Sequence, residues 1–157
     1  MKITHSVRYD ASPDEVYAML TDPSFREKAS WAQSVESVEV SVEGASVRID
    51  MVQPNTDIPK ALRTFAGAST HAIQAEAWDA AGRQAEFSVT TPGKPAGITG
   101  TRRLVADGSG TLDQFEGEAK AKVPLIGGKI ESLIAQKLKD GWDIEHGLGA
   151  AWLGGER

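Results

Sequence analysis

The sequence predicts an α+β fold, in which antiparallel strands make up most of the chain and one long helix completes it. Three observations lead to this prediction. Segments in which apolar and polar residues alternate recur along the chain, as expected of half-buried strands. Two helix-start signals follow the first such segment, and an apolar stripe at helical spacing occupies residues 126–152. With 157 residues, the chain is expected to form a single domain over residues 1–157.

The first elements are one strand and two short helices. Alternation over residues 2–9 predicts a half-buried strand with His5 on its apolar face. Ser12 and Pro13 then supply an N-cap and a first-turn proline, with Glu15 as the capping-box partner, so a short helix begins there. Asp22-Pro23 repeats this signal and predicts a second short helix that ends at about residue 31.

A β-hairpin, an insert and a meander follow. Apolar and polar residues alternate over 38–42 and 47–51, and the Gly44-Ala45 turn between them reverses the chain. From residue 54 to 69 apolar residues recur at helical spacing instead, which predicts a short amphipathic insert. Four further antiparallel strands are predicted at residues 70–79, 84–90, 97–106 and 111–123.

The last strand and the final helix have distinct faces. Odd-numbered residues from Phe115 to Val123 are apolar or small, whereas charged residues occupy the even-numbered positions 116–122. Pro124 opens the long helical pattern, and Gly154-Gly155 ends it. The charged face of the strand is therefore expected to contact solvent.

Composition excludes several kinds of partner and chemistry. With 17 basic and 22 acidic residues the net charge is −5, so binding of nucleic acid, which needs an electropositive surface, is not expected. The chain has no cysteine, which removes disulfides, thiolate nucleophiles and cysteine-ligated zinc. Residues 1–6 lack the apolar stretch of a signal peptide, and no later stretch is long enough to span a membrane. We therefore expect a cytoplasmic protein without stable membrane insertion.

Recognisable catalytic and metal-binding motifs are missing from the sequence. There is no Gly-x-Ser-x-Gly elbow, no His-x-x-x-His pair and no phosphate-binding glycine loop. Three separated histidines without cysteine make a poor metal site. Asp143 and His146 have the helical spacing of an acid–base pair, but Asp143 lies off the apolar stripe, which favours a solvated face. We expect no catalytic residue, no metal ion and no cofactor.

Several short stretches are similar to those of a known family. They are Thr21-Asp22-Pro23-Ser24-Phe25 after the first helix, Trp78, Pro92-Gly93 before Gly100-Thr101, and Val-Pro-Leu-Ile-Gly-Gly-Lys-Ile-Glu at 123–131. Together with the order of the elements, they resemble the START-like superfamily, also called SRPBCC or helix-grip. Within it they resemble an actinobacterial domain-of-unknown-function family, number 2505. The resemblance extends over nearly the whole chain.

The resemblance implies a helix-grip fold, in which a curved antiparallel sheet of six or seven strands wraps around the long C-terminal helix. Two short helices follow the first strand. Members of the superfamily bind lipids, sterols, polyketides or other hydrophobic molecules in a cavity, and some catalyse cyclisation, dehydration or hydrolysis there. The narrower family has no assigned activity, so the resemblance implies a fold and no particular functional residues.

Small residues on the predicted inner face favour a cavity. Ala75, Ala77 and Ala85 occupy strand positions where a filled core needs bulky side chains. The small residues within 117–121 fit either a cavity or a close approach of the long helix. Gly141 lies on the apolar stripe of that helix, where glycine costs about 1 kcal/mol relative to alanine. Space for a ligand, tight packing against a strand and a local helix break each account for it.

Three polar residues are also predicted to face inward. His5 and His71 have the parity of apolar strand residues, and placing Leu104 inside selects Arg102 over Arg103. One interpretation is a polar floor that orients a carboxylate, phosphate or carbonyl group of a ligand. The other is structural, with the histidines bonded to backbone and the arginine paired with an internal carboxylate.

These observations favour binding of a hydrophobic or amphipathic small molecule, such as a lipid or polyketide, by a carrier or sensor. The main alternative is an enzyme of the cyclase or dehydratase type using His5, His71 or Arg102, and the second is a protein-interaction module with a filled core. The insert over 58–65 either gates the cavity or packs as core. The predicted ligand-binding residues are His5, Val7, Tyr9, Ile49, Met51, Leu62, Phe65, His71, Ala75, Ala77, Phe87, Arg102, Gly141 and Glu145.

Overall fold

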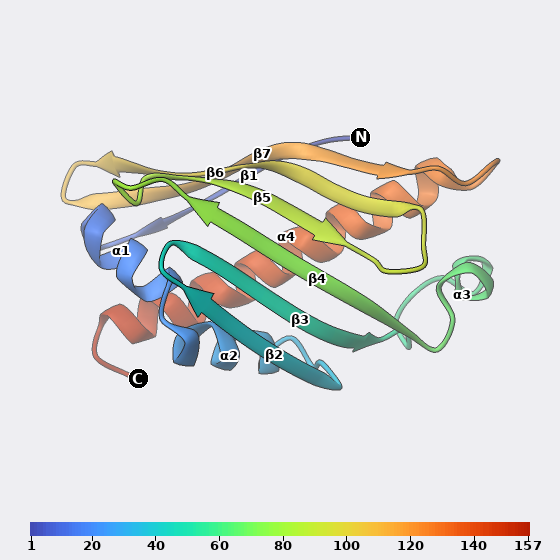
Figure 1. Ribbon diagram of the computed structural model, residues 1–157, viewed down its shortest axis with the longest axis horizontal. Helices are drawn as coiled ribbons and strands as arrows, with labels where there is room; N and C mark the ends of the chain where they lie inside the picture. The colour runs from blue at the N-terminus through green and yellow to red at the C-terminus, as the bar shows by residue number, and fades with distance from the viewer.

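A computed structural model describes residues 1–157 and contains seven strands and four helices (Figure 1). The strands form one antiparallel sheet in the order β1-β7-β6-β5-β4-β3-β2. The predicted order of elements is confirmed. In chain order they are β1 (Lys2–Tyr9), α1 (Pro13–Leu20), α2 (Pro23–Trp31), β2 (Ser37–Glu43), β3 (Ser46–Pro54), α3 (Lys60–Ala66), β4 (Ser69–Trp78), β5 (Gln84–Thr90), β6 (Ala96–Asp107), β7 (Gly110–Ala121) and α4 (Gly127–Leu153).

The helices lie on one face of the curved sheet (Figure 1). Strands β2 to β7 pair in sequence order, and α1 and α2 carry the chain from β1 at one edge to β2 at the other. Helix α4 crosses the inner face, with α1 and α2 at one end of it and α3 at the opposite end (Figure 1). None of the four helices combines the length and apolar composition that crossing a membrane requires.

Both predicted short helices begin at the predicted residues. The Ser12 hydroxyl accepts a hydrogen bond from the Glu15 backbone N–H at 3.2 Å, as an N-cap does. It also donates one to the Glu15 carboxylate at 3.0 Å, whereas a full capping box would join that carboxylate to the Ser12 backbone N–H. The Asp22 carboxylate accepts from the Ser24 N–H at 2.8 Å. The long helix, however, begins at Gly127, beyond the proline at which its pattern was predicted to open. A tight turn at residues 124–126 precedes it, because the Ile126 N–H donates to the carbonyl two residues back at 2.9 Å.

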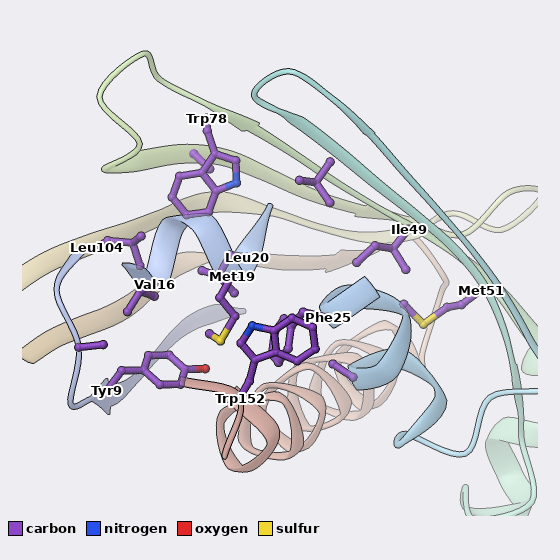
Figure 2. Close-up of a cluster of buried hydrophobic side chains, with 14 of the residues drawn as sticks. Tyr9, Val16, Met19, Leu20, Phe25, Ile49, Met51, Trp78, Leu104 and Trp152 are labelled. Atoms are coloured by element: carbon purple, nitrogen blue, oxygen red, sulfur yellow. The ribbon is translucent and has the colours of Figure 1, made fainter. Parts of the chain in front are cut away.

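The largest hydrophobic cluster fills the space between the sheet, α1, α2 and the C-terminal half of α4 (Figure 2). In it the Phe25 and Trp152 rings pack edge to face, with centroids 5.3 Å apart. Ala85, predicted to border a cavity, is fully buried in this cluster instead. A second cluster, which includes Phe87, Phe115 and Trp142, packs the middle of α4 against the sheet. A third contains Ile58, Leu62 and Ile130 beside α3.

Gly117 and its neighbour Gly100 on β6 make room for an aromatic ring. A Cβ atom on Gly117 would lie 2.6 Å from the Phe115 ring, and one on Gly100 would lie 2.9 Å from it. The glycine at 117 therefore serves neither of the roles predicted for it, since the space above it is filled by a side chain of its own strand. The adjacent Ala119 is fully buried in the same cluster.

The predicted faces of β1, β3, β6 and β7 are confirmed. On β6, Arg102 and Leu104 are buried while Arg103 is exposed. On β7, Phe115 is buried, and the charged positions 116, 118 and 120 are exposed. Adjacent strands thus present one apolar face to α4.

The predicted face of β4 is wrong. His71, Ala75 and Ala77 lie on the outer face, where the His71 ring contacts Asp50 with an Nε2–Oδ1 distance of 2.5 Å. The inner face of β4 instead carries Ala72, Gln74, Glu76 and Trp78.

Strand register is the reason for this reversal. Val47 and Ile49 of β3 face the core, and they stand opposite Glu76 and Gln74 of β4. Directly opposed residues of an antiparallel pair share a face. The apolar face of β3 therefore brings two polar residues of β4 inside.

The face assignment of β7 is open to a direct test. We expect Phe115→Ala to lower the free energy of unfolding by about 3–5 kcal/mol, since it empties a packed aromatic site. Glu116→Ala, on the opposite face, is expected to change it by less than about 0.5 kcal/mol. Urea unfolding of the two variants measures both values, and equal losses would contradict the assignment.

Candidate functional site

A cavity of about 140 Å³ lies between the inner face of the sheet and α4, at the end of the molecule where α3 stands. Strands β3 to β6 form one wall and α4 forms the other. At the roughly 30 Å³ that each water molecule occupies in the liquid, the cavity corresponds to about five waters. Much of its wall is apolar and includes Met51, Ala72, Val89, Ile98, Ile134 and Leu138.

Helix α3 covers the outer end of the cavity and is held there by two lysines. Lys94, in the β5–β6 loop, donates a hydrogen bond from its ammonium group to the Ala66 carbonyl. The same ammonium lies 5.6 Å from the centroid of the Phe65 ring, which lines the cavity. Lys137 of α4 pairs with Asp57, before α3, at 3.0 Å. These contacts join the insert to both cavity walls.

The anchoring of α3 itself is slight. Leu62 is its only buried side chain, and its N-cap residue, Pro59, provides no side-chain hydrogen bond. A short helix with few buried contacts and no side-chain N-cap opens at lower free energy than the packed core. The insert thus lines the cavity with apolar side chains and is also an element suited to uncover it.

The inner end of the cavity is polar, with Gln33, Gln74, Arg102 and Glu145 among the lining residues. The Gln74 amide nitrogen donates to the Glu76 carboxylate at 2.9 Å. The amide oxygen of Gln74 has no hydrogen-bond donor in the protein, since the only side-chain bond of this residue is through its nitrogen. This end therefore offers an amide group to a ligand.

Gly141 gives space to a neighbouring side chain. A Cβ atom at this position would lie 2.5 Å from the Gln33 amide oxygen. Helix α4 continues without a break from Gly127 to Leu153. Of the explanations open from the sequence, the helix break is contradicted, and the neighbour of Gly141 is a turn side chain after α2 and not a strand. Both Gly141 and Gln33 line the cavity.

Behind the polar end, five charged side chains form a buried ion cluster. Arg102 donates to Asp113 at 3.0 and 2.6 Å, to Glu76 at 3.1 Å and to Glu145 at 2.8 Å. Arg26 donates to both carboxylate oxygens of Glu76, at 3.0 and 2.8 Å, and lies 3.4 Å from Glu145. All five residues are buried. Because an unpaired buried charge is strongly destabilising, the members depend on one another.

Charge pairing shifts the pKa values within the ion cluster. Burial alone would raise the pKa of Glu76, but Arg26 and Arg102 lower it to about 2. For Asp113 burial prevails over the attraction of Arg102, and its pKa is raised. Three carboxyl groups thus surround two guanidinium groups, and the pKa values of Glu76 and Asp113 shift in opposite directions.

Trp142 completes the surroundings of Arg102. The guanidinium carbon lies 4.0 Å from the centroid of the Trp142 ring, a cation–π contact. The carboxylates already take four hydrogen bonds from this guanidinium, which has five N–H groups. Arg102 is therefore engaged mainly with the protein.

The predicted ligand-binding residues fall into three groups. Met51, Leu62, Phe65, Arg102, Gly141 and Glu145 line the cavity. Val7, Tyr9, Ile49 and Phe87 face the interior but pack in the hydrophobic clusters beside it. Outside the cavity lie His5, whose Nε2 is 2.7 Å from Asp143 Oδ1, and the outer-face residues His71, Ala75 and Ala77.

Sequence reasoning missed the residues that shape the polar end. Gln74 and Glu76 share strand parity with Trp78, and this bulky apolar residue was the signal that their face is buried. Asp113 similarly shares the parity of Phe115. For Arg26 the sequence offered no such signal. Its burial on α2 becomes favourable only beside the carboxylates of β4 and α4.

The mutual dependence of the ion cluster can be measured by removing one charge. Glu76→Gln is expected to lower the free energy of unfolding at neutral pH by about 3 kcal/mol, since it removes the carboxylate that both buried arginines share and leaves Arg26 with Glu145 alone. Glu86→Gln, an exposed position on β5, is the control and should change it by less than about 0.5 kcal/mol. Urea unfolding distinguishes the two, and a neutral Glu76→Gln variant would contradict the account.

The difference in unfolding free energy between the wild type and Glu76→Gln should also depend on pH. A carboxyl group with a lowered pKa adds stability above its unfolded pKa and loses this contribution as the pH falls through the folded value. The advantage of the wild type over Glu76→Gln is therefore expected to shrink between about pH 4.5 and about pH 2. The raised pKa of Asp113 acts in the opposite direction and does not produce this loss. An advantage that stays constant across this range in urea unfolding would contradict the lowered pKa.

Several solved structures share this fold over nearly the whole chain. TTHA0849 from Thermus thermophilus has a TM-score of 0.68 and 19% identity, with 98% of this chain and 97% of that chain covered. The ZhuI aromatase/cyclase from Streptomyces sp. R1128 has a TM-score of 0.65 and 13% identity, with 98% and 93% covered. Truncated norcoclaurine synthase from Thalictrum flavum has a TM-score of 0.67 and 14% identity, with 100% and 95% covered. At these identities the likeness shows the fold alone.

Sequence comparison adds the family. No curated protein matches the chain. A family model described as "Protein of unknown function (DUF2505)" matches residues 4–153, a range that includes every residue lining the cavity and the whole ion cluster. The chain therefore belongs to the DUF2505 family and has the helix-grip fold of the START-like superfamily, as the resemblance implied.

Proposed function

We propose that the protein binds a small hydrophobic or amphipathic molecule in the cavity between the sheet and α4, as a carrier or sensor. The observation that carries this proposal is an apolar-walled cavity with one polar end and a weakly anchored cover. Ligand sites combine an apolar lining with a few placed polar groups in this way. The structural neighbours support the fold on which the proposal depends.

The charge of the ion cluster restricts the polar group of the ligand. Three carboxyl groups face two guanidinium groups at the inner end of the cavity, so an anionic group would meet no uncompensated positive charge there. The amides of Gln33 and Gln74 suit a hydroxyl, carbonyl or amide group. We therefore assign Arg102 to shaping the polar end and the two glutamines to contacting an uncharged polar group.

The volume restricts the size of the ligand. A space for about five waters holds a molecule of about one ring. A larger lipid or polyketide requires α3 to move away from the cavity. In this proposal the helix acts as a cover, and opening breaks the contacts of Lys94 with Ala66 and of Lys137 with Asp57.

The placement of the histidines favours binding over the enzymatic alternative. That alternative used His5, His71 or Arg102 in the cavity. Neither histidine lines it, and Arg102 is bound by three carboxylates. The alternative of a filled core is disfavoured by the cavity itself. Binding without turnover is therefore the proposed function.

A pair of alanine substitutions on one strand tests the cavity. Ala72 lines it, whereas Ala75 lies on the outer face of the same strand. N-phenyl-1-naphthylamine, an uncharged fluorescent probe whose three rings require α3 to move, is expected to brighten with wild-type protein and to stabilise it by about 2.7 kcal/mol at a hundredfold excess over its Kd. Ala72→Leu should abolish both effects by filling the space, and Ala75→Leu should keep them.

Probe fluorescence and thermal unfolding of the three proteins provide the measurement. Binding that survives Ala72→Leu would place the probe elsewhere. A folded Ala75→Leu variant that has lost binding would show that the outer face, not the cavity, is the site. No binding by the wild type across a panel of uncharged aromatic and lipid probes would overturn the proposal.

A further inference from the structure

Three segments far apart in the sequence meet at one end of the molecule (Figure 1). They are residues 55–68 around α3, residues 91–96 between β5 and β6, and residues 120–131 between β7 and α4, and together they are called the mouth end here. Lys94 bonds to Ala66, and the Lys122 N–H donates to the Pro95 carbonyl at 2.9 Å. All three segments contribute residues to the hydrophobic cluster around Leu62 and to the wall of the cavity.

The mouth end is basic although the protein is acidic. Its three segments contain six basic and two acidic residues, a charge of +4, whereas the whole chain carries −5. Both acidic residues are already paired, Asp57 with Lys137 and Glu131 with the N-terminal ammonium group. Lys60, Lys122 and Lys129 are exposed and make no ion pair within the chain. The ammonium groups of these three lysines are therefore available to bind an anionic partner.

A fully exposed leucine protrudes from the same end. Leu125 has φ of 70° and lies at the centre of a turn in which the Ile126 N–H donates to the Pro124 carbonyl at 2.9 Å. Such a turn with positive φ is rare and strained for a residue other than glycine. The Leu125 side chain is 103% exposed, so no packing within the protein offsets the strain.

We propose that the mouth end docks reversibly on an anionic phospholipid bilayer. Leu125 enters the boundary between headgroups and acyl chains, and Lys60, Lys122 and Lys129 contact the lipid phosphates. An exposed apolar tip and exposed lysines at the same end of the molecule match both layers of such a surface, whereas an acidic polymer would use the lysines alone. The acidic remainder of the protein is repelled from the same surface, which orients the cavity cover towards the lipid.

Docking of the mouth end would bring the opening of the cavity against the membrane. That docking serves ligand transfer rests on the proposed function. The cover α3 belongs to the mouth end, so a hydrophobic ligand could pass between bilayer and cavity without crossing water. The docking itself is measured without a ligand. Its test therefore does not depend on the result of the probe experiment.

Vesicle co-sedimentation of the full chain tests docking. The protein is expected to sediment with vesicles of phosphatidylcholine mixed with phosphatidylserine, not with phosphatidylcholine alone, and to be released by salt. Lys122→Gln with Lys129→Gln should weaken partitioning by about fivefold for each lysine. Lys28→Gln, an exposed lysine on α2, is the matched control and should leave it unchanged.

Leu125→Gly is the more specific test of docking. It should weaken vesicle binding by about tenfold or more, through lost apolar burial, while the thermal unfolding midpoint stays the same or rises because glycine relieves the strained turn. Asparagine also tolerates positive φ, so Leu125→Asn should have the same effects on vesicle binding and on the unfolding midpoint. Val105→Ser removes an exposed apolar side chain of β6 outside the mouth end and should leave binding unchanged.

Three results would overturn docking: no preference for anionic vesicles, full binding by Leu125→Gly, or an equal loss in the Lys28→Gln and Val105→Ser controls. Binding to poly-L-glutamate as tight as to vesicles, and insensitive to Leu125→Gly, would assign the mouth end to an acidic protein partner instead. Naphthylamine binding by the docking variants separates the two proposals. Retained probe binding with lost vesicle binding supports docking as a separate property of the mouth end.

Discussion

The pairing of Arg102 with three carboxylates is the constraint on which the interior depends. Its partners come from β4, β7 and α4, and Arg26 adds α2 through the carboxylate of Glu76. Removing buried charges from water is costly unless each one is matched at close range. The ion cluster therefore sets how α4 and α2 sit on the sheet, because small displacements would separate charges that have no access to solvent.

The ion cluster also divides the interior into two parts with different packing. On one side Trp78 donates from its indole N–H to Glu76 at 3.2 Å and belongs to the large hydrophobic cluster. On the other side Arg102 and Glu145 line the cavity. Bulky rings such as Phe25 and Trp152 fill the first part, whereas Ala72 contributes little volume to the second. A charged partition thus lets one small domain contain both a close-packed core and a ligand-sized space.

The two ends of the molecule differ in how firmly they are held. At the end with α1 and α2, side-chain caps and aromatic packing secure each helix. At the other end α3 has one buried side chain, and hydrogen bonds from Asn55 and Lys94 to Ala66 with one exposed ion pair of Lys137 hold it. Local opening concentrates where few apolar contacts oppose it. The cavity, its cover and the strained turn at Leu125 all lie at this less stable end, so the proposed exchange of ligand and the proposed docking use the same part of the fold.

The sequence by itself determined the elements, their order and most of their faces, because these depend on neighbours along the chain. The N-cap of Ser12 with Glu15 and the alternation along β7 are local properties of this kind. The sequence carried opposing signals for the face of β4, and the tertiary structure decided between them. Ile73 and two alanines favoured one face, whereas Trp78 shares the other with polar residues, until register placed Gln74 opposite Ile49.

The ion cluster and the position of the cavity were likewise decided by tertiary structure. A charged residue such as Arg26 or Glu76 is expected on a solvated face when only its own segment is considered. It becomes stable inside when oppositely charged partners from other elements lie within ion-pairing distance. Burial of a strand face follows from alternation along the chain, but charge pairing and empty space depend on distances between segments that the sequence order does not contain.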